Sequence, residues 1–160
     1  MIILGIDPGM AVTGYGIIKT KNKDMKTKNS LVYVAHGVIK TPVGMEMGER
    51  LKMLRLKLRK IIRDYRPHCL VIEQHFFGRN SKTAMVVGQA RGVVLMTTAE
   101  CRLPLFEYQS LAVKKMLTQD GRAEKMKIQK VVQKILRMKK RPTPNDAADA
   151  LALAIYHTLK

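Results

Sequence analysis

The sequence predicts an α/β fold: a mixed five-stranded sheet with helices on both faces. Short apolar runs alternate with longer segments of helical periodicity, in the order β-β-β-α-β-α-β-α. The three strands at the N-terminus are closely connected, which is typical of a meander. With 160 residues and 46% apolar composition, the chain is long enough to bury a substantial core, and residues 1–160 are expected to form one domain.

The first half of the chain should contain most of the sheet and one basic helix. Apolar runs predict strands at residues 2–6, 14–19, 31–40 and 69–73. A helix is expected over 45–65, because apolar residues recur there every three or four positions and Arg66-Pro67 then stops it. The same periodicity places Arg50 on a face away from the core. The connection at 21–30 is polar and basic, as in a loop or extended hairpin tip.

The second half should be mainly helical. A helix over 81–99 is rich in small residues, which would allow close helix–helix approach within the fold or across a dimer. A short strand over 104–108 precedes two further helices, at 110–117 and 124–138. A final apolar helix is expected from Pro144 to near the C-terminus.

The chain is strongly basic, with a formal net charge of +18 and an isoelectric point near 10.2. Such an imbalance predicts binding to a polyanion through phosphate neutralisation and counterion release. The basic helix around 50–63 and the run 122–141 offer many candidate phosphate contacts. The alternatives are a basic protein without such a partner, or contact with an anionic membrane surface, although no strongly amphipathic basic terminus stands out.

The sequence favours a cytoplasmic protein. No apolar stretch approaches the roughly 20 residues that span a bilayer. The first apolar run lacks a preceding basic region, so it does not resemble a signal peptide. Cys69 and Cys101 have no metal-type partner nearby, which indicates structural thiols in a reducing compartment.

Acidic residues stand at the edges of the most apolar segments. The chain has only 12 acids against 30 Lys and Arg, yet four of the 12 occupy such places: Asp7, Glu73, Asp146 and Asp149. If the first and fourth strands are parallel neighbours, Asp7 and Glu73 converge at the sheet edge where α/β proteins hold ligands. Asp146 and Asp149 are three residues apart and share a helix face.

Each acid also has a structural interpretation. Asp7-Pro8-Gly9 is a common turn, and Glu73 could pair with a buried arginine. Thr143 could cap the last helix with Asp146 at its third position, as in a capping box. Asp149 lies deeper in the apolar helix and has no such explanation. One site is a simpler account than four coincidences.

Converging carboxylates repel each other unless cations neutralise them. The four acids would hold two Mg²⁺ ions, or Mn²⁺ in their place, with the two ions about 4 Å from each other. One ion would activate a water for attack on a phosphodiester, and the other would stabilise the leaving 3′ oxygen. A basic chain that concentrates acids at one point therefore suits a phosphodiesterase.

Motifs in order along the chain resemble the RuvC-type Holliday junction resolvases. They are Ile6-Asp7-Pro8-Gly9, Thr13-Gly14-Tyr15-Gly16, Ile72-Glu73-Gln74, Phe76, Gly88-Gln89-Ala90-Arg91-Gly92, Phe106-Glu107-Tyr108, Val113-Lys114, Ala123-Glu124-Lys125 and Asp146-Ala147-Ala148-Asp149-Ala150-Leu151-Ala152. The resemblance implies an RNase H-like fold, a homodimer, and Mg²⁺-dependent symmetric nicking of four-way DNA junctions. It also makes a RuvA/RuvB branch-migration complex a candidate partner.

The resemblance also assigns roles to residues. The family's four metal-ligand acids fall on the four carboxylates above, and its two site lysines fall on Lys114 and Lys125. Its aromatic near the catalytic glutamate falls on Phe76, which could stack on an unpaired base at the junction centre. We expect Arg79 and Asn80 to contact the substrate as well.

Three other functions remain open at this point. An RNase H-like nuclease could act on another nucleic acid, such as an RNA–DNA hybrid, and fold alone does not separate the two. The turn from Asp7 to Gly14 also resembles the phosphate loop of actin-like or sugar-kinase ATPases, but those need two such domains. A catalytically silent nucleic-acid-binding module is the last alternative, and the presence of all four acids argues against it.

Overall fold

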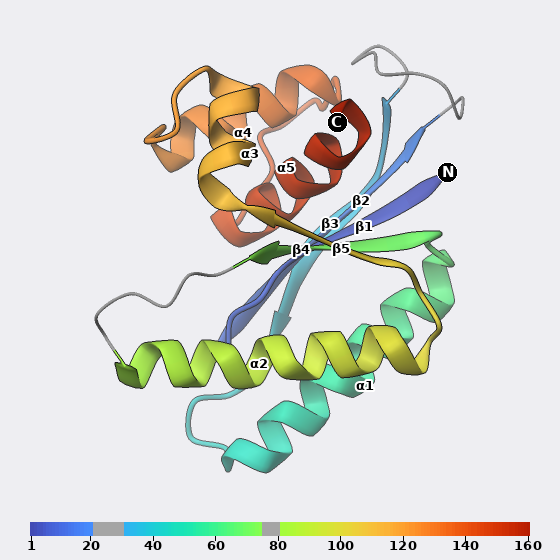
Figure 1. Ribbon diagram of the computed structural model, residues 1–160, viewed down its shortest axis with the longest axis vertical. Helices are drawn as coiled ribbons and strands as arrows, with labels where there is room; N and C mark the ends of the chain where they lie inside the picture. The colour runs from blue at the N-terminus through green and yellow to red at the C-terminus, as the bar shows by residue number, and fades with distance from the viewer. Residues whose placement is uncertain (21–30, 75–80) are drawn as a thin grey trace.

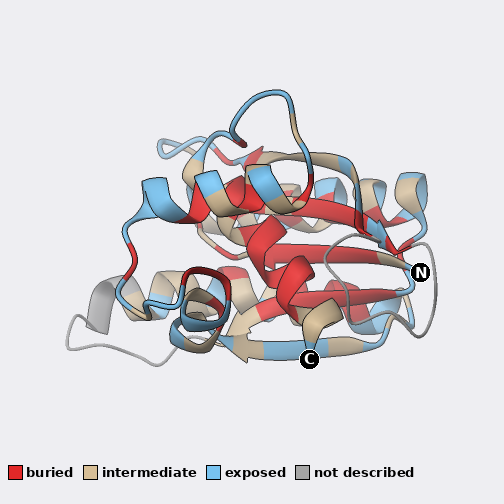
Figure 2. Ribbon diagram, turned by 90° about the horizontal axis from the view of Figure 1, so that it is seen from above, coloured by how far each residue is buried: buried red, intermediate tan, exposed pale blue. Residues whose placement is uncertain are grey.

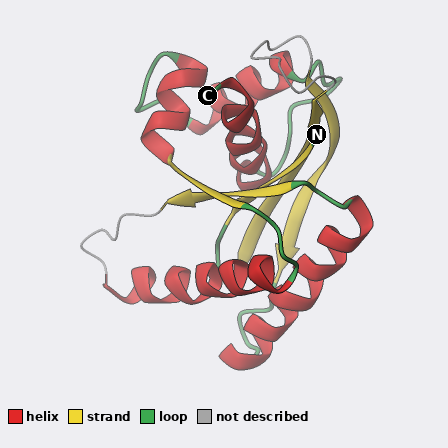
Figure 3. Cartoon of the chain, turned by 45° about the vertical axis from the view of Figure 1, so that its right-hand side comes forward, coloured by secondary structure: helices red, strands yellow, loops and turns green. Residues whose placement is uncertain are grey.

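The computed structural model describes residues 1–20, 31–74 and 81–160, without the side chains of 81–83. One mixed sheet crosses the middle of the molecule, and helices cover both of its faces, as predicted (Figures 1 and 3). The elements are β1 Ile2–Asp7, β2 Val12–Thr20, β3 Leu31–Lys40, α1 Met47–Tyr65, β4 Cys69–Gln74, α2 Ser81–Glu100, β5 Leu105–Gln109, α3 Ser110–Thr118, α4 Lys125–Ile135 and α5 Asn145–Leu159.

The sheet has the strand order β3-β2-β1-β4-β5. The first three strands are antiparallel, whereas β4 pairs in parallel with both β1 and β5. In Figure 1, α1 and α2 lie on one side of this sheet, and α3, α4 and α5 lie on the other. The carboxyl ends of β1, β4 and β5 therefore meet at one edge of the sheet.

Alternation along the strands divides the core into two layers. Ile3 and Val71 pack with α5 and α4, whereas Leu4 and Ile72 pack with α1 and α2. Figure 2 shows buried residues along the inner strands and along most of α5. The α5 helix is buried because its run of Ala and Leu lies directly on the sheet.

Glycines in β1 and β2 allow α5 to approach the sheet backbone closely. A Cβ at Gly5 would overlap the carbonyl of Ala150, and a Cβ at Gly14 would overlap that of Asp146. These strand positions accept only hydrogen on the side that faces α5. The close contact sets the depth of the last helix relative to the strand ends.

Two helices differ from the sequence prediction. Arg50, expected on the outer face of α1, is buried and its Nε donates to the hydroxyl of Thr41, 3.3 Å away. The α4 helix ends at Ile135 rather than at 138, because Arg137 adopts a left-handed backbone with φ of 51°. Within the described parts of the chain, no helix is long and apolar enough to cross a membrane.

Candidate active site

Two of the predicted acids lie side by side at the ends of parallel strands. Ile6 of β1 is in register with Ile72 of β4, so Asp7 and Glu73 are the next residues on their strands. Asp7 lies two positions beyond Gly5, which faces the backbone of α5. Glu73 lies two positions beyond Val71, which packs in the core layer that contains α5. By the alternation of strand side chains, both carboxylates face the α5 side of the sheet.

The last helix brings Asp146 and Asp149 to the same edge. Gly14 is the partner of Asp7 across the β1–β2 pair, and the backbone of Asp146 lies against Gly14. Asp149 follows almost one turn later on the same helix face. The predicted convergence of four acids from three separate segments is therefore a feature of the fold.

The turn that follows Asp7 is closed by a single threonine. The hydroxyl of Thr13 donates to the carbonyl of Gly9 at 2.6 Å and lies 3.4 Å from the amide of Gly9. Thr13 is itself buried. The short connection between β1 and β2 is thus ordered directly beside the carboxylate of Asp7.

The capping explanation of Asp146 is wrong. The residue at the N-cap of α5 is Pro144, not Thr143, and no side chain caps the helix. A tertiary contact orders this end instead: Nε2 of the buried Gln129 donates to the carbonyl of Pro142 at 3.0 Å and to Oδ1 of Asn145 at 2.9 Å. Asp146 is therefore left available for the acidic cluster.

The acids act on each other electrostatically. Burial, and then the charges of Glu73, Asp149 and Asp146, raise the pKa of Asp7 from its ordinary 3.8 to about 8, with Lys125 opposing the shift. Burial also raises the pKa of Asp149, against the lowering effect of Lys114 and Lys125. At neutral pH, such a cluster holds a proton or needs a cation.

A pocket joins these groups to the start of α3. It is lined by Glu73, Asp149 and Lys114 together with Ser110 and apolar residues of α3, α4 and α5. Of the two lysines suggested by the family resemblance, Lys114 thus lines the pocket with the acids, and Lys125 is close enough to oppose the pKa shifts of Asp7 and Asp149. Ser110 was not predicted from the sequence. It is the first residue after β5, which is parallel to β4. Its place at the carboxyl end of a parallel strand, where α/β proteins bind ligands, is a signal that could have identified it.

The donor set suits a hard divalent cation. All four acids offer carboxylate oxygens, which Mg²⁺ and Mn²⁺ prefer. Across the described residues, however, no three His, Cys, Asp or Glu side chains are grouped so that they could hold a metal ion as they stand. The carboxylates thus form an acidic cluster whose chemistry fits such an ion, rather than a finished coordination shell.

Three predicted substrate contacts cannot be placed. Phe76, Arg79 and Asn80 lie in the segment 75–80, outside the described residues. The segment connects β4, which carries Glu73, to the start of α2. The predictions for these three residues therefore stay predictions.

Fold and site together define the class of protein. A five-stranded sheet of this topology, with acids at the ends of β1 and β4 and on the last helix, is an RNase H-like fold of the nuclease type. The family described as "Crossover junction endodeoxyribonuclease RuvC" matches residues 3–157. The chain therefore belongs to the RuvC family, as its motifs predicted.

Individual relatives agree with this assignment. The crossover junction endodeoxyribonuclease RuvC of Desulfitobacterium hafniense (strain DSM 10664 / DCB-2) is 46% identical, over 98% of this chain and 92% of its own length. That of Syntrophomonas wolfei is 44% identical, over 98% and 88%. The structure titled "T. thermophilus RuvC in complex with Holliday junction substrate" has a TM-score of 0.88 and 31% identity, over 99% of this chain and 93% of its own.

Proposed function

We propose that this protein is a structure-specific DNA endonuclease that resolves four-way (Holliday) junctions by paired symmetric nicks. The observation that carries the proposal is the assembly of Asp7, Glu73, Asp146 and Asp149 at one sheet edge in a chain of the RuvC family. Residues 1–160 would act as one nuclease domain. The substrate is that of the Thermus relative, whose structure was solved with a Holliday junction.

The four carboxylates would hold two Mg²⁺ ions, with Mn²⁺ able to substitute. Bound there, the ions would supply an activated water and stabilise the leaving 3′ oxygen. The charges of the other three acids all raise the pKa of Asp7, after burial, so the four carboxylates are near enough to interact. Asp149, almost one turn beyond Asp146 on α5, lines the pocket together with Glu73. The chain thus presents oxygen donors from both the sheet and the helix.

Lys114 and Lys125 would act on the phosphate itself. Both lower the pKa of Asp149, and Lys125 lowers that of Asp7, so their ammonium groups lie within the field of the acids. A scissile phosphate bound beside the acids would meet these cations. They would stabilise the charge that develops on the phosphate oxygens in the transition state.

The homodimer that the family resemblance implies would use α2. Over 84–100 its exposed positions are Met85, Gln89, Gly92, Met96, Ala99 and Glu100, and the first five form a stripe at the heptad spacing of helix pairs. The stripe has no charged residue, although the chain carries +18, and its two methionines are 63% and 47% exposed. Such an apolar, uncharged face fits a second copy, which would place two active sites on one junction.

The proposed substrate also suggests where the protein acts and which further partner it has. A DNA junction as substrate implies the cytoplasm for a bacterial relative of this family. A RuvA/RuvB branch-migration complex is the partner we propose to deliver such junctions.

One cleavage assay tests the proposed function. An immobile four-way junction, a plain duplex and an RNA–DNA hybrid are each incubated with the protein, with and without Mg²⁺. We expect paired nicks in opposite strands of the junction, only with Mg²⁺, and little cleavage of the other two. Preferential cleavage of the hybrid would identify an RNase H-like nuclease of another specificity. Binding without cleavage of any substrate would indicate a silent module.

A further inference from the structure

A second basic feature lies apart from the acidic pocket. The connection between α4 and α5 forms one wall of a broad groove, and Tyr33 and His36 of β3 form the other. Four of the five residues at 137–141 are basic, and the groove lining contains no acid. We call residues 137–141 the basic segment.

The fold holds this segment in place at both ends. Its far end is fixed where Gln129 donates to the carbonyl of Pro142. Near its start, Nε2 of Gln133 donates to the carbonyl of Met138 at 3.3 Å. On the opposite wall, the hydroxyl of Tyr33 lies 2.9 Å from Nδ1 of His36. Burial lowers the pKa of His36, and a hydrogen bond with the backbone of Thr143 opposes this shift. Hydrogen bonds therefore fix the positions of both walls of the groove.

Three cations of the basic segment have no ion pair with any residue that the structure describes: Lys139, Lys140 and Arg141. Lys139 and Lys140 are exposed, and neither forms an ion pair with any residue that the structure describes. Arg141 is also exposed, and its Nη1 contacts only the sulfur of Met126 among these residues, at 3.4 Å. An anion that entered the groove would meet cations without displacing a protein carboxylate.

One end of the groove lies close in sequence to the acids of the last helix. Thr143, which lines it, is three residues before Asp146, and Gln129 anchors both sides of this short stretch. The groove also lies on the α5 side of the sheet, where Tyr33 packs against the same core layer as α5. A polyanion whose phosphate is at the acids could therefore extend into the groove.

We propose that this groove binds the sugar–phosphate backbone of one duplex arm of the junction, away from the scissile phosphate. The proposal rests on the proposed function, because it names a contact of that substrate. A row of consecutive cations along a broad, open groove suits a linear backbone with repeated charges. A single small anion would instead need donors that converge on one point. The groove makes no sequence-specific contact and contributes to affinity and orientation.

The test is a pair of matched double variants. Lys139→Gln/Lys140→Gln removes two charges from the groove, and Lys52→Gln/Lys60→Gln removes two from α1, on the other face of the sheet. Junction binding is measured against salt for both. We expect the groove variant to bind roughly tenfold more weakly, with the log–log salt slope reduced by about 1.8, since each phosphate contact contributes about 0.9. The α1 variant should retain the slope of the wild type.

Arm length locates the contact. On a junction whose arms are too short to reach the groove, the groove variant should bind as well as the wild type. The cleavage rate at saturating junction should be unchanged on both substrates, because Lys139 and Lys140 do not line the acidic pocket.

Other results would overturn the proposal. An unaltered salt slope in the groove variant would show that the groove binds no phosphate, and a protein partner would then be the remaining candidate for the basic segment. Equal losses in both double variants would mean that only total charge matters. The proposed function fails separately, if the wild-type protein does not cleave the junction with Mg²⁺.

Discussion

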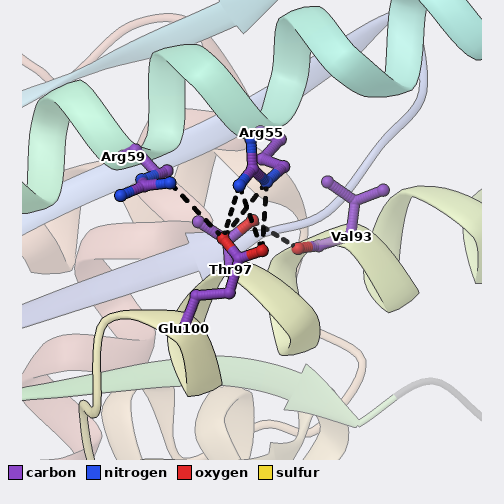
Figure 4. Close-up of polar contacts among 5 residues, drawn as sticks. All are labelled: Arg55, Arg59, Val93, Thr97 and Glu100. Carbon is purple, nitrogen blue, oxygen red and sulfur yellow. Dashed lines mark hydrogen bonds and ion pairs between the residues drawn. The ribbon is translucent and has the colours of Figure 1, made fainter.

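The two faces of the sheet arrange their charges in opposite ways. On the α1 and α2 face, bases and acids are paired: Arg55 and Arg59 reach from α1 to Glu100 of α2, at 3.0 and 3.8 Å (Figure 4). Lys60 likewise pairs with Asp64. On the α5 face the acids gather at one point, and the basic segment lies apart from them. The ion pairs of the first arrangement offset part of its positive charge, whereas the second keeps acids and bases apart.

This difference separates structural charge from functional charge. Exposed ion pairs of the first kind contribute about 0.2–1 kcal/mol each and attract no ligand. Burial, and then the neighbouring acids, raise the pKa of Asp7, so the fold tolerates this carboxyl group only where a proton or cation can neutralise it. The sequence offered both the helix around 50–63 and the run 122–141 for phosphate contacts. The second lies on the same face of the sheet as α5, whereas α1 lies on the opposite face (Figure 1).

The largest effect should come from the clustered acids. Asp7→Asn or Glu73→Gln should lower the nicking rate by roughly a thousandfold or more, with junction affinity equal to or above that of the wild type. Each change removes negative charge close to the bound phosphate and also removes an oxygen ligand. Single-turnover cleavage and binding are measured in parallel. Glu100→Gln, which alters a paired acid on the other face, is the control and should cleave normally.

A smaller but still large effect is expected from the glycine that seats α5. Gly14→Ala places a Cβ against the carbonyl of Asp146, so the helix must move away from Asp7. Cleavage should fall by roughly a hundredfold, since displacements of about 1 Å can have that effect. Gly44→Ala is the matched control, because a Cβ at Gly44 meets nothing within 4 Å. Normal cleavage by the Gly14 variant would contradict the role assigned to this contact.

The cations beside the acids should have an intermediate effect. Lys125→Ala should slow the chemical step roughly tenfold to a hundredfold on every cleaved substrate, because the lost charge acts in the transition state. Lys127→Ala removes an exposed lysine on the same helix, paired with Asp120 at 3.6 Å, and should cleave almost normally. Rapid-quench measurement at saturating junction distinguishes the two. Equal rates would place Lys125 among the solvated charges.

The last prediction concerns stability in EDTA rather than cleavage. The pKa of Asp7 is about 8 in the folded chain and near 3.8 when unfolded, so the folded chain retains a proton that the unfolded chain releases. Stability should therefore fall as the pH rises from about 4 to 8. Asp7→Asn should flatten this decline and raise the melting temperature at pH 8 by roughly 5 °C. Mg²⁺ should stabilise the wild type more than the variant.

The sequence by itself determined the architecture and most of the site. Apolar periodicity identified the strands and helices, and four acids at the edges of apolar segments indicated the cluster because buried carboxylates demand a neutralising partner. The motifs around Asp7, Glu73 and Asp149 then predicted the family, which the comparisons confirm. Local pattern sufficed here because these residues follow directly from where each apolar run ends.

Tertiary structure alone decided what depended on contacts between distant segments. Gln129, far from the acids in sequence, orders the start of α5 in place of the expected cap at Thr143. Arg50 is buried against Thr41, although its helical position reads as outward. Whether a lysine or arginine is paired or available also depends on which acids the fold brings near it. Charge composition predicted a polyanion partner, but only the packing of helices on the sheet separated Arg55, Arg59 and Lys60 of α1, which form ion pairs, from Lys139 and Lys140 of the groove, which form none with the described residues.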